Sequence, residues 1–207
     1  TIQARRATPR QDPPAVPEAR DLEDRWTNPA IRLAQFENQF AWTEYLGDAI
    51  PYFDTQIGPG SFGLFIGVKP HFAPDTVWYE PCLEDLRDPN RLAFNPEGKW
   101  WRVHLDLVRA GLEAAGGRYL VSIPDLVEGL DTLAAAYNNQ KLLYALIDEP
   151  EAVHAHLRRL GELYFEAYDP IYEMVKGPEG GSVFSAFQTW APGRYAKVQC
   201  DIAATLG

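Results

Sequence analysis

Short apolar segments rich in β-favouring residues alternate along this chain with long helical patterns. Residues 119–123 predict a strand that Pro124 ends, and residues 182–187 predict a second strand. Between them, the most regular apolar stripe of the chain covers residues 153–175 and predicts a long helix in which Pro170 introduces a kink. A strand, a helical connection and a further strand predict parallel strands joined by right-handed crossovers.

The same alternation extends toward the N-terminus. Asn28 before Pro29 predicts a helix start, with the helix ending near Gly47, and residues 50–53 predict a short buried strand. Roughly three or four strand and helix units can be counted, whereas a closed barrel of eight units takes about 250 residues. We therefore expect the N-terminal part of a TIM (β/α)8-type barrel at residues 28–207, incomplete at its C-terminus. An open doubly wound sheet is the alternative, although its GxGxxG turn is missing.

The composition limits the classes of partner. A net charge of -10 argues against nucleic acid and anionic membranes, and the absence of a run of eighteen apolar residues argues against a membrane span. We expect a cytoplasmic protein. The basic residues Arg5, Arg6 and Arg10 lie in a Pro/Arg-rich arm, residues 1–27, which either wraps the surface or folds over an anionic ligand.

Polar residues follow two of the predicted strands. Asp54 comes directly after residues 50–53, and Gln188 and Trp190 follow residues 182–187 on a predicted loop. Because the carboxyl ends of parallel strands lie at one edge of a sheet, we expect these side chains to share one pocket. An amide beside an indole suits a planar or methylated ligand.

Further candidates lie near these strand ends. Arg194 could clamp a ligand carboxylate, and Tyr195 could shield the site. Asp125 is favoured as a helix cap paired with Glu128, but it also follows a strand. The complete predicted set consists of Asp54 as the catalytic residue, with Gln188, Trp190, Arg194, Tyr195, Asp125, Asp201 and His71 as binding residues, and no metal ligand.

Four segments in the same order resemble the uroporphyrinogen decarboxylase superfamily, which includes corrinoid-dependent methyltransferases. The family's "FSDI" strand end resembles residues 52–55, and its "GRxPLIGFxGxPxTL" segment resembles residues 117–124. Its "PExVHxLL" helix resembles residues 150–157, and its "FDSWAG" strand end resembles residues 187–193. The resemblance implies a TIM barrel, with Asp54 in the position of the aspartate that faces the pyrrole nitrogens in the decarboxylases.

The chain also departs from the family pattern. No segment between Glu18 and Leu46 matches the arginine-rich "RQAGRY" that grips substrate carboxylates, and Gln188 replaces the carboxylate of "DSWAG". The resemblance therefore favours methyl transfer from a small methylated compound, linked to a corrinoid protein, with zinc ligands expected beyond Gly207. Decarboxylation of uroporphyrinogen, a tetrapyrrole precursor, is one alternative, and a non-catalytic ligand-binding barrel is the other.

Overall fold

The computed structural model describes residues 2–127, 129–196 and 198–205. Within these ranges the protein is a mixed α/β structure, which confirms the predicted class, and its strands form no closed barrel. The described residues divide into two compact units. Unit 1 comprises residues 2–57, 103–124 and 174–194, and unit 2 comprises the remaining described residues.

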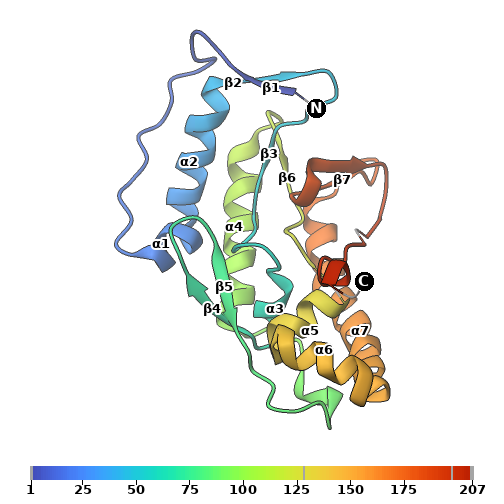
Figure 1. Ribbon diagram of the computed structural model, residues 1–207. Coiled ribbons are helices and arrows are strands. Elements are labelled where there is room, and N and C mark those ends of the chain that lie inside the picture. Colours follow the sequence, from blue (N-terminus) through green and yellow to red (C-terminus); the bar gives the residue numbers. More distant parts are fainter. Residues whose placement is uncertain (1, 128, 197, 206–207) are drawn as a thin grey trace. The chain divides into compact units, whose positions relative to one another are not determined.

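The elements of unit 1 come from three separate parts of the chain (Figure 1). They are β1 (Ile2–Arg5), α1 (Leu22–Thr27), α2 (Pro29–Trp42), β2 (Thr43–Leu46), β3 (Tyr52–Phe53), most of α4 (Lys99–Ala115), β6 (Leu120–Val121), β7 (Ser182–Phe184), η2 (Ala186–Gln188) and β8 (Thr189–Ala191). Those of unit 2 are α3 (Phe62–Phe65), β4 (Lys69–Phe72), β5 (Val77–Glu80), η1 (Pro89–Arg91), α5 (Gly129–Tyr137), α6 (Asn139–Asp148), nearly all of α7 (Pro150–Val175) and η3 (Ile202–Thr205).

Three parallel strands form the centre of unit 1. β3 pairs with β6 in the register Tyr52↔Leu120, and Ile123 continues from β6 into a parallel bridge with Phe184 of β7. The N–H of Ile123 donates to the carbonyl of Val183 over 2.8 Å, which ties β7 to this ladder. The predicted parallel pairing is therefore confirmed for these three strands, which have the chain order that successive strand and helix units require.

α4 packs directly on one face of these strands. A Cβ added at Gly111 would lie 2.5 Å from Cδ1 of Phe53 and 3.1 Å from Cγ2 of Val121, so only glycine permits this close approach. Phe36 of α2 also contacts the same layer, with its ring 5.6 Å from Phe53 and 4.7 Å from Tyr119. Phe53 and Val121 are therefore tightly packed against α4.

The start of the N-terminal arm is held against β2 and the end of α2. β1 pairs antiparallel with β2, and the N–H groups of Arg6 and Arg10 donate to the last carbonyls of α2. The prediction that the helix starting at Asn28 and Pro29 ends near Gly47 is wrong. α2 ends at Trp42, and the hydroxyl and N–H of Thr43 donate to the carbonyls of Gln39 and Phe40. The strand that follows is favoured by its pairing with β1, a contact that helical periodicity does not report.

A buried carboxylate fixes the arm to the body of unit 1. Glu37 accepts hydrogen bonds from Gln11, from the hydroxyl of Tyr119 over 2.7 Å, and from the guanidinium of Arg118 over 2.7 and 2.9 Å. Burial raises the pKa of Glu37, but the hydrogen bonds from Arg118, Tyr119 and Gln11 outweigh it and lower the pKa overall. The carboxylate is therefore charged in the folded protein at neutral pH.

β8 is an element that the sequence pattern did not predict. Residues 188–195 were expected to form a loop, but Thr189–Ala191 pairs antiparallel with β7 in the register Val183↔Trp190. Phe187 and Gln188 have positive φ values of 57° and 51°, which reverse the chain, and the indole of Trp190 lies 2.9 Å from where a Cβ of Gly181 would be. Trp190 thus returns along β7 instead of projecting beyond its carboxyl end.

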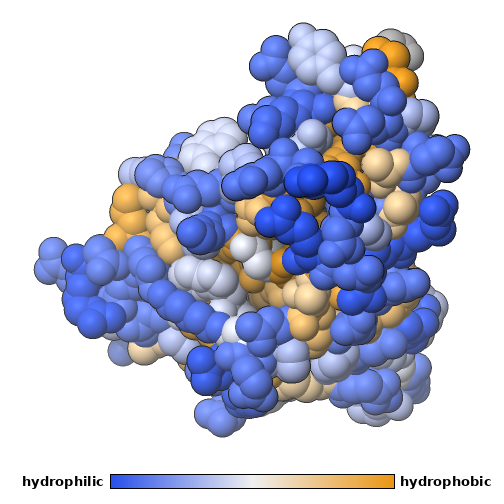
Figure 2. All heavy atoms as spheres, turned by 90° about the horizontal axis from the view of Figure 1, so that it is seen from below, coloured by the Kyte–Doolittle hydropathy of each residue, from blue (hydrophilic) through white to orange (hydrophobic). Residues whose placement is uncertain are grey.

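Unit 2 is built from helices and one hairpin. The buried stripe of α7 agrees with the predicted long helix, which runs through Pro170, and Tyr164, Tyr168 and Tyr172 stack along it with ring centroids 5.6 and 5.9 Å apart. β4 and β5 form the hairpin, in which His71 lies opposite Trp78. Figure 2 shows a face that is mostly hydrophilic, with hydrophobic residues in separate patches. No helix within the described residues has the length and apolar character needed to cross a bilayer.

Candidate functional site

Polar residues follow each of the three parallel strands of unit 1. Asp54 and Thr55 come after β3, Ser122 after β6 and Ser185 after β7. The hydroxyl of Thr55 donates to the carbonyl of Ser122 over 2.9 Å, and the hydroxyl of Tyr52 donates to the carbonyl of Ser185 over 3.2 Å. We call this group of residues, together with Arg32 and His104 described below, the carboxyl-end cluster.

The strand alternation separates the two faces of the cluster. Phe53 and Val121 point toward α4, so the neighbouring Tyr52 points to the opposite face. Burial raises the pKa of Tyr52 to about 12, with the charges of Asp54 and Tyr45 adding to the shift. The Tyr52 hydroxyl is therefore protonated at neutral pH and acts as a donor near the Asp54 carboxylate.

Asp54 is half-buried and has a local structural role. Its carboxylate oxygen Oδ1 accepts the N–H of Gln56 over 3.0 Å, which closes a turn after β3. This turn is the ordinary explanation for an aspartate at a strand end. It also holds the carboxylate in a fixed position, so a positively charged ligand beside Asp54 would meet a preorganised anion.

Arg32 of α2 supports the backbone after β3. Its guanidinium donates to the carbonyls of Trp26 and Gln56 over 2.8 Å and to the carbonyl of Asp54 over 3.0 Å. Burial lowers the pKa of Arg32, while the charge of Asp54 acts in the opposite direction. The sequence pattern missed this residue, although an arginine between Ile31 and Leu33 on a helix with buried faces was a signal. Arg32 binds main-chain oxygens here, which is a different task from gripping a substrate carboxylate.

His104 of α4 completes the cluster from the other face. Its ring is fully buried, and Nδ1 lies 3.2 Å from the carbonyl oxygen of Thr55, so Nδ1 carries the proton because a carbonyl only accepts. Burial lowers the pKa of His104 to about 4, and the nearby charge of Arg32 lowers it further, against the raising effect of the Thr55 hydrogen bond. The sequence pattern does not indicate His104, because no local spacing connects this helix residue with Thr55.

The other predicted residues of unit 1 lie on or after the β7–β8 hairpin. Gln188 is exposed in the turn, and its Oε1 accepts from the amide of Gln3 over 3.4 Å. Trp190 is 46% exposed on β8 and packs on Gly181, near the amino end of β7, so its predicted place beyond the strand end is wrong. Arg194 is exposed after the hairpin.

The remaining predicted residues belong to unit 2. Asp125 is buried, and its charge raises the pKa of Tyr79 in addition to the larger effect of burial; its proposed capping partner Glu128 lies outside the described residues. The N–H of Tyr195 donates to the hydroxyl of Tyr168 over 3.2 Å. His71 is exposed on β4, and Asp201 lines a cavity discussed below. The predicted set is thus divided between two units.

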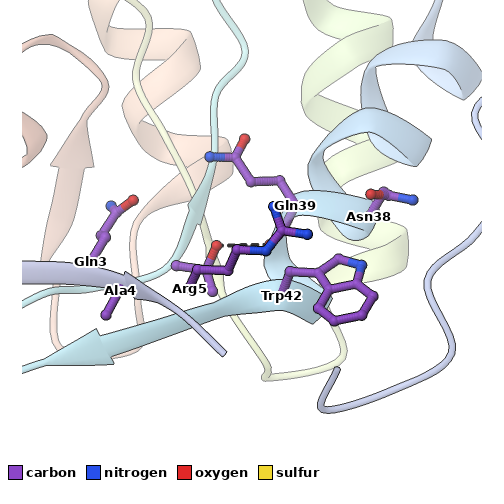
Figure 3. A pocket seen from close by; sticks show the side chains of 7 residues that line it. Gln3, Ala4, Arg5, Asn38, Gln39 and Trp42 are labelled. Atoms are coloured by element: carbon purple, nitrogen blue, oxygen red, sulfur yellow. Dashed lines mark hydrogen bonds between the residues drawn. The ribbon is translucent and has the colours of Figure 1, made fainter. Parts of the chain in front are cut away.

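A second polar region of unit 1 lies beside the arm. A cavity of about 500 Å³ is lined by β1 and the last turn of α2, where the guanidinium of Arg5 stacks 5.5 Å from the ring of Trp42 and Gln39 lies close by (Figure 3). Arg6 pairs with Glu44, and Arg10 donates to the carbonyl of Thr43. Cations near the last turn of a helix complement its dipole, which accounts for the basic composition of the arm without a ligand.

The described residues contain no group of three or more His, Cys, Asp and Glu side chains that could hold a metal ion. These residues by themselves therefore do not form a zinc site. The fold and the cluster define a mixed α/β protein with polar groups at the carboxyl ends of parallel strands. Comparison of the chain with protein-family models, curated proteins and solved structures gives no match.

Proposed function

We propose that the chain is part of a TIM barrel of the uroporphyrinogen decarboxylase superfamily and that its carboxyl-end cluster binds a small methylated or tetrapyrrole-related ligand. The reaction that we propose is methyl transfer linked to a corrinoid protein. The observation that carries the proposal is the position of Asp54: it follows an apolar strand that pairs in parallel with β6, and Ile123 after β6 forms a parallel bridge to β7. Sites of α/β proteins are commonly built at this edge.

The chemistry of the cluster suits a ligand that already carries positive charge, such as a methylated ammonium group, which leaves as the neutral amine once its methyl group has moved to the corrinoid. A carboxylate that the Gln56 N–H already holds in place needs little reorganisation to stabilise such a charge. The Tyr52 hydroxyl donates its proton to the Ser185 carbonyl, and its oxygen can still accept a hydrogen bond from a donor group of the ligand. Asp54 is assigned the role of charge stabiliser, and Tyr52 that of positioning acceptor.

Methyl transfer is proposed ahead of decarboxylation because of the arginines that the chain has and lacks. A uroporphyrinogen carries several carboxylates, and the family's decarboxylases grip them with an arginine-rich segment that this chain does not match. Arg32, the arginine nearest to Asp54 in the hydrogen-bond network, is engaged with three main-chain carbonyls. This supports a substrate without multiple carboxylates.

A closed barrel imposes one further requirement. The strand that follows β7 in such a barrel would pair with the edge of β7 that β8 occupies here. The proposal therefore includes release of β8 from β7 in the closed barrel. The cross-strand pair Val183 and Trp190 is the place where this release can be followed, for example by the fluorescence of Trp190.

The test uses the full-length protein under anaerobic conditions with methylated amines and thiols as candidate donors and cob(I)alamin as acceptor. Formation of methylcobalamin, followed by its absorbance spectrum, is the expected result. Asp54→Asn keeps an oxygen that can accept the Gln56 N–H but removes the charge, and it should lower the rate about a hundredfold. The matched variant Asp48→Asn, at an exposed position, should keep the parent rate.

Two other outcomes replace this proposal. Release of carbon dioxide from uroporphyrinogen that depends on Asp54 would assign decarboxylation instead. Binding of a ligand without turnover of any substrate would assign a non-catalytic barrel, a second candidate favoured by Gln188, whose neutral amide stands where the family has a carboxylate and is exposed in a turn. Equilibrium dialysis beside each activity assay distinguishes binding from catalysis.

A further inference from the structure

Unit 2 contains a cavity of about 780 Å³ that has no part in the proposed function. β5, α3, α5 and the start of α6 line it together with η3, and every described lining residue belongs to unit 2. Figure 1 shows η3, in red, beside α5. The volume falls within the range of about 300–1,000 Å³ that is typical of small-molecule sites.

The walls of the cavity are mostly apolar. Small residues such as Gly60, Gly63, Ala134 and Ala135 leave the space, because none carries a side chain larger than a methyl group. Trp78 borders this space and is 65% exposed, although it lies in the middle of β5. A large aromatic ring exposed beside a hollow lined by small residues offers a stacking surface to a ligand.

The charges that border the cavity are of one sign. Asp131 and Asp201 line it, and the described lining residues include no lysine, arginine or histidine. Asp131 accepts the N–H groups of Asp201 and Ile202 over 2.7 and 2.8 Å, which fixes η3 as one wall. A carboxylate can accept about four hydrogen bonds, so Asp131 can accept further bonds besides these two.

We propose that this cavity binds an organic ammonium ion with an apolar body, which stacks on Trp78 while Asp131 and Asp201 balance its charge. An indole face attracts cations, and most strongly those with weakly hydrated alkyl substituents. The apolar walls accept the body of the ligand, and the two carboxylates select its charge. The proposal is independent of the carboxyl-end cluster, because all of its described residues belong to unit 2.

The test measures binding to the full-length protein by titration calorimetry with three probes. Choline and 3,3-dimethylbutan-1-ol have the same shape but differ in charge, and choline should bind about tenfold more tightly. Benzyltrimethylammonium adds an apolar body and should bind more tightly than choline. Equal binding of choline and its neutral isostere would overturn the proposal, as would a failure of all three probes to bind.

Variants locate the site. Trp78→Ala should weaken benzyltrimethylammonium binding about tenfold, whereas Tyr144→Ala, at an aromatic residue of similar exposure on α6, should leave it unchanged. Asp201→Asn should weaken binding of the cations and not of the alcohol, and Asp148→Asn, at an exposed position, is its control. Circular dichroism and thermal midpoints establish that each variant is folded. Equal effects in a variant and its control would place the binding elsewhere and refute the assignment.

Discussion

The buried histidine of the carboxyl-end cluster makes a quantitative prediction about stability and pH. His104 has its pKa lowered by burial from the usual 6.5 to about 4, so the unfolded chain binds a proton more readily than the folded one. The contribution of neutral His104 to the free energy of unfolding is present above pH 6.5 and is lost as the pH falls toward 4. These two values imply a loss of about 2 kcal/mol between pH 7 and pH 5, and about 3 kcal/mol by pH 4.

The assay is urea unfolding at pH 7 and pH 5 on the parent and on His104→Asn. Asparagine can still donate to the carbonyl of Thr55, but it does not titrate, so the variant should lose about 2 kcal/mol less than the parent over this interval. His154→Asn, at an exposed position of α7, should keep the full dependence of the parent. If His104→Asn loses as much stability as the parent, His104 does not have a lowered pKa, and its assigned place in the cluster is wrong.

Two further predictions concern packing and charge in unit 1. Gly111→Ala should lower the free energy of unfolding by about 1–3 kcal/mol, because its methyl would overlap Phe53. Gly161→Ala, at a position of α7 with open space around it, should raise the free energy of unfolding by about 0.5–1 kcal/mol. A similar loss in both variants would contradict the close packing of α4. Glu37→Gln should lower the free energy of unfolding by about 2 kcal/mol at pH 7. This is less than the loss of a fully buried ion pair, because Arg118 is partly exposed. The difference between the parent and the variant should shrink as the pH falls below about 4.5, where the carboxylate of the unfolded chain is protonated. Glu113→Gln, at an exposed position of the same unit, should have little effect in the same urea titration, and no loss in Glu37→Gln would refute the buried network.

The elements with a strong local period could be predicted from the sequence. The helix of residues 150–175 and the strands that became β3, β6 and β7 follow from the spacing of their apolar residues and from the prolines and glycines at their ends. The position of Asp54 after β3 follows with them. β2 and β8 could not be predicted in this way, because each is stabilised by pairing with a partner strand rather than by its own pattern.

The carboxyl-end cluster shows the same division. Its serine, threonine and aspartate residues lie where the strands end, and the order of the strands places them together. Arg32 and His104 enter the cluster from two helices, through hydrogen bonds to backbone around Asp54 that no spacing in the sequence encodes.

The amino-acid sequence by itself therefore determined the long helix of residues 150–175, the strands β3, β6 and β7, and an alternation that gives an α/β protein. These properties depend on neighbours within a few residues, where the helical and strand periods fix which side chains face the core. Only the tertiary structure decided that the arm wraps α2, that Trp190 turns back along β7, and that a buried histidine supports Thr55. Those contacts join residues far apart in the chain, and their free energy exists only once the surrounding elements have packed.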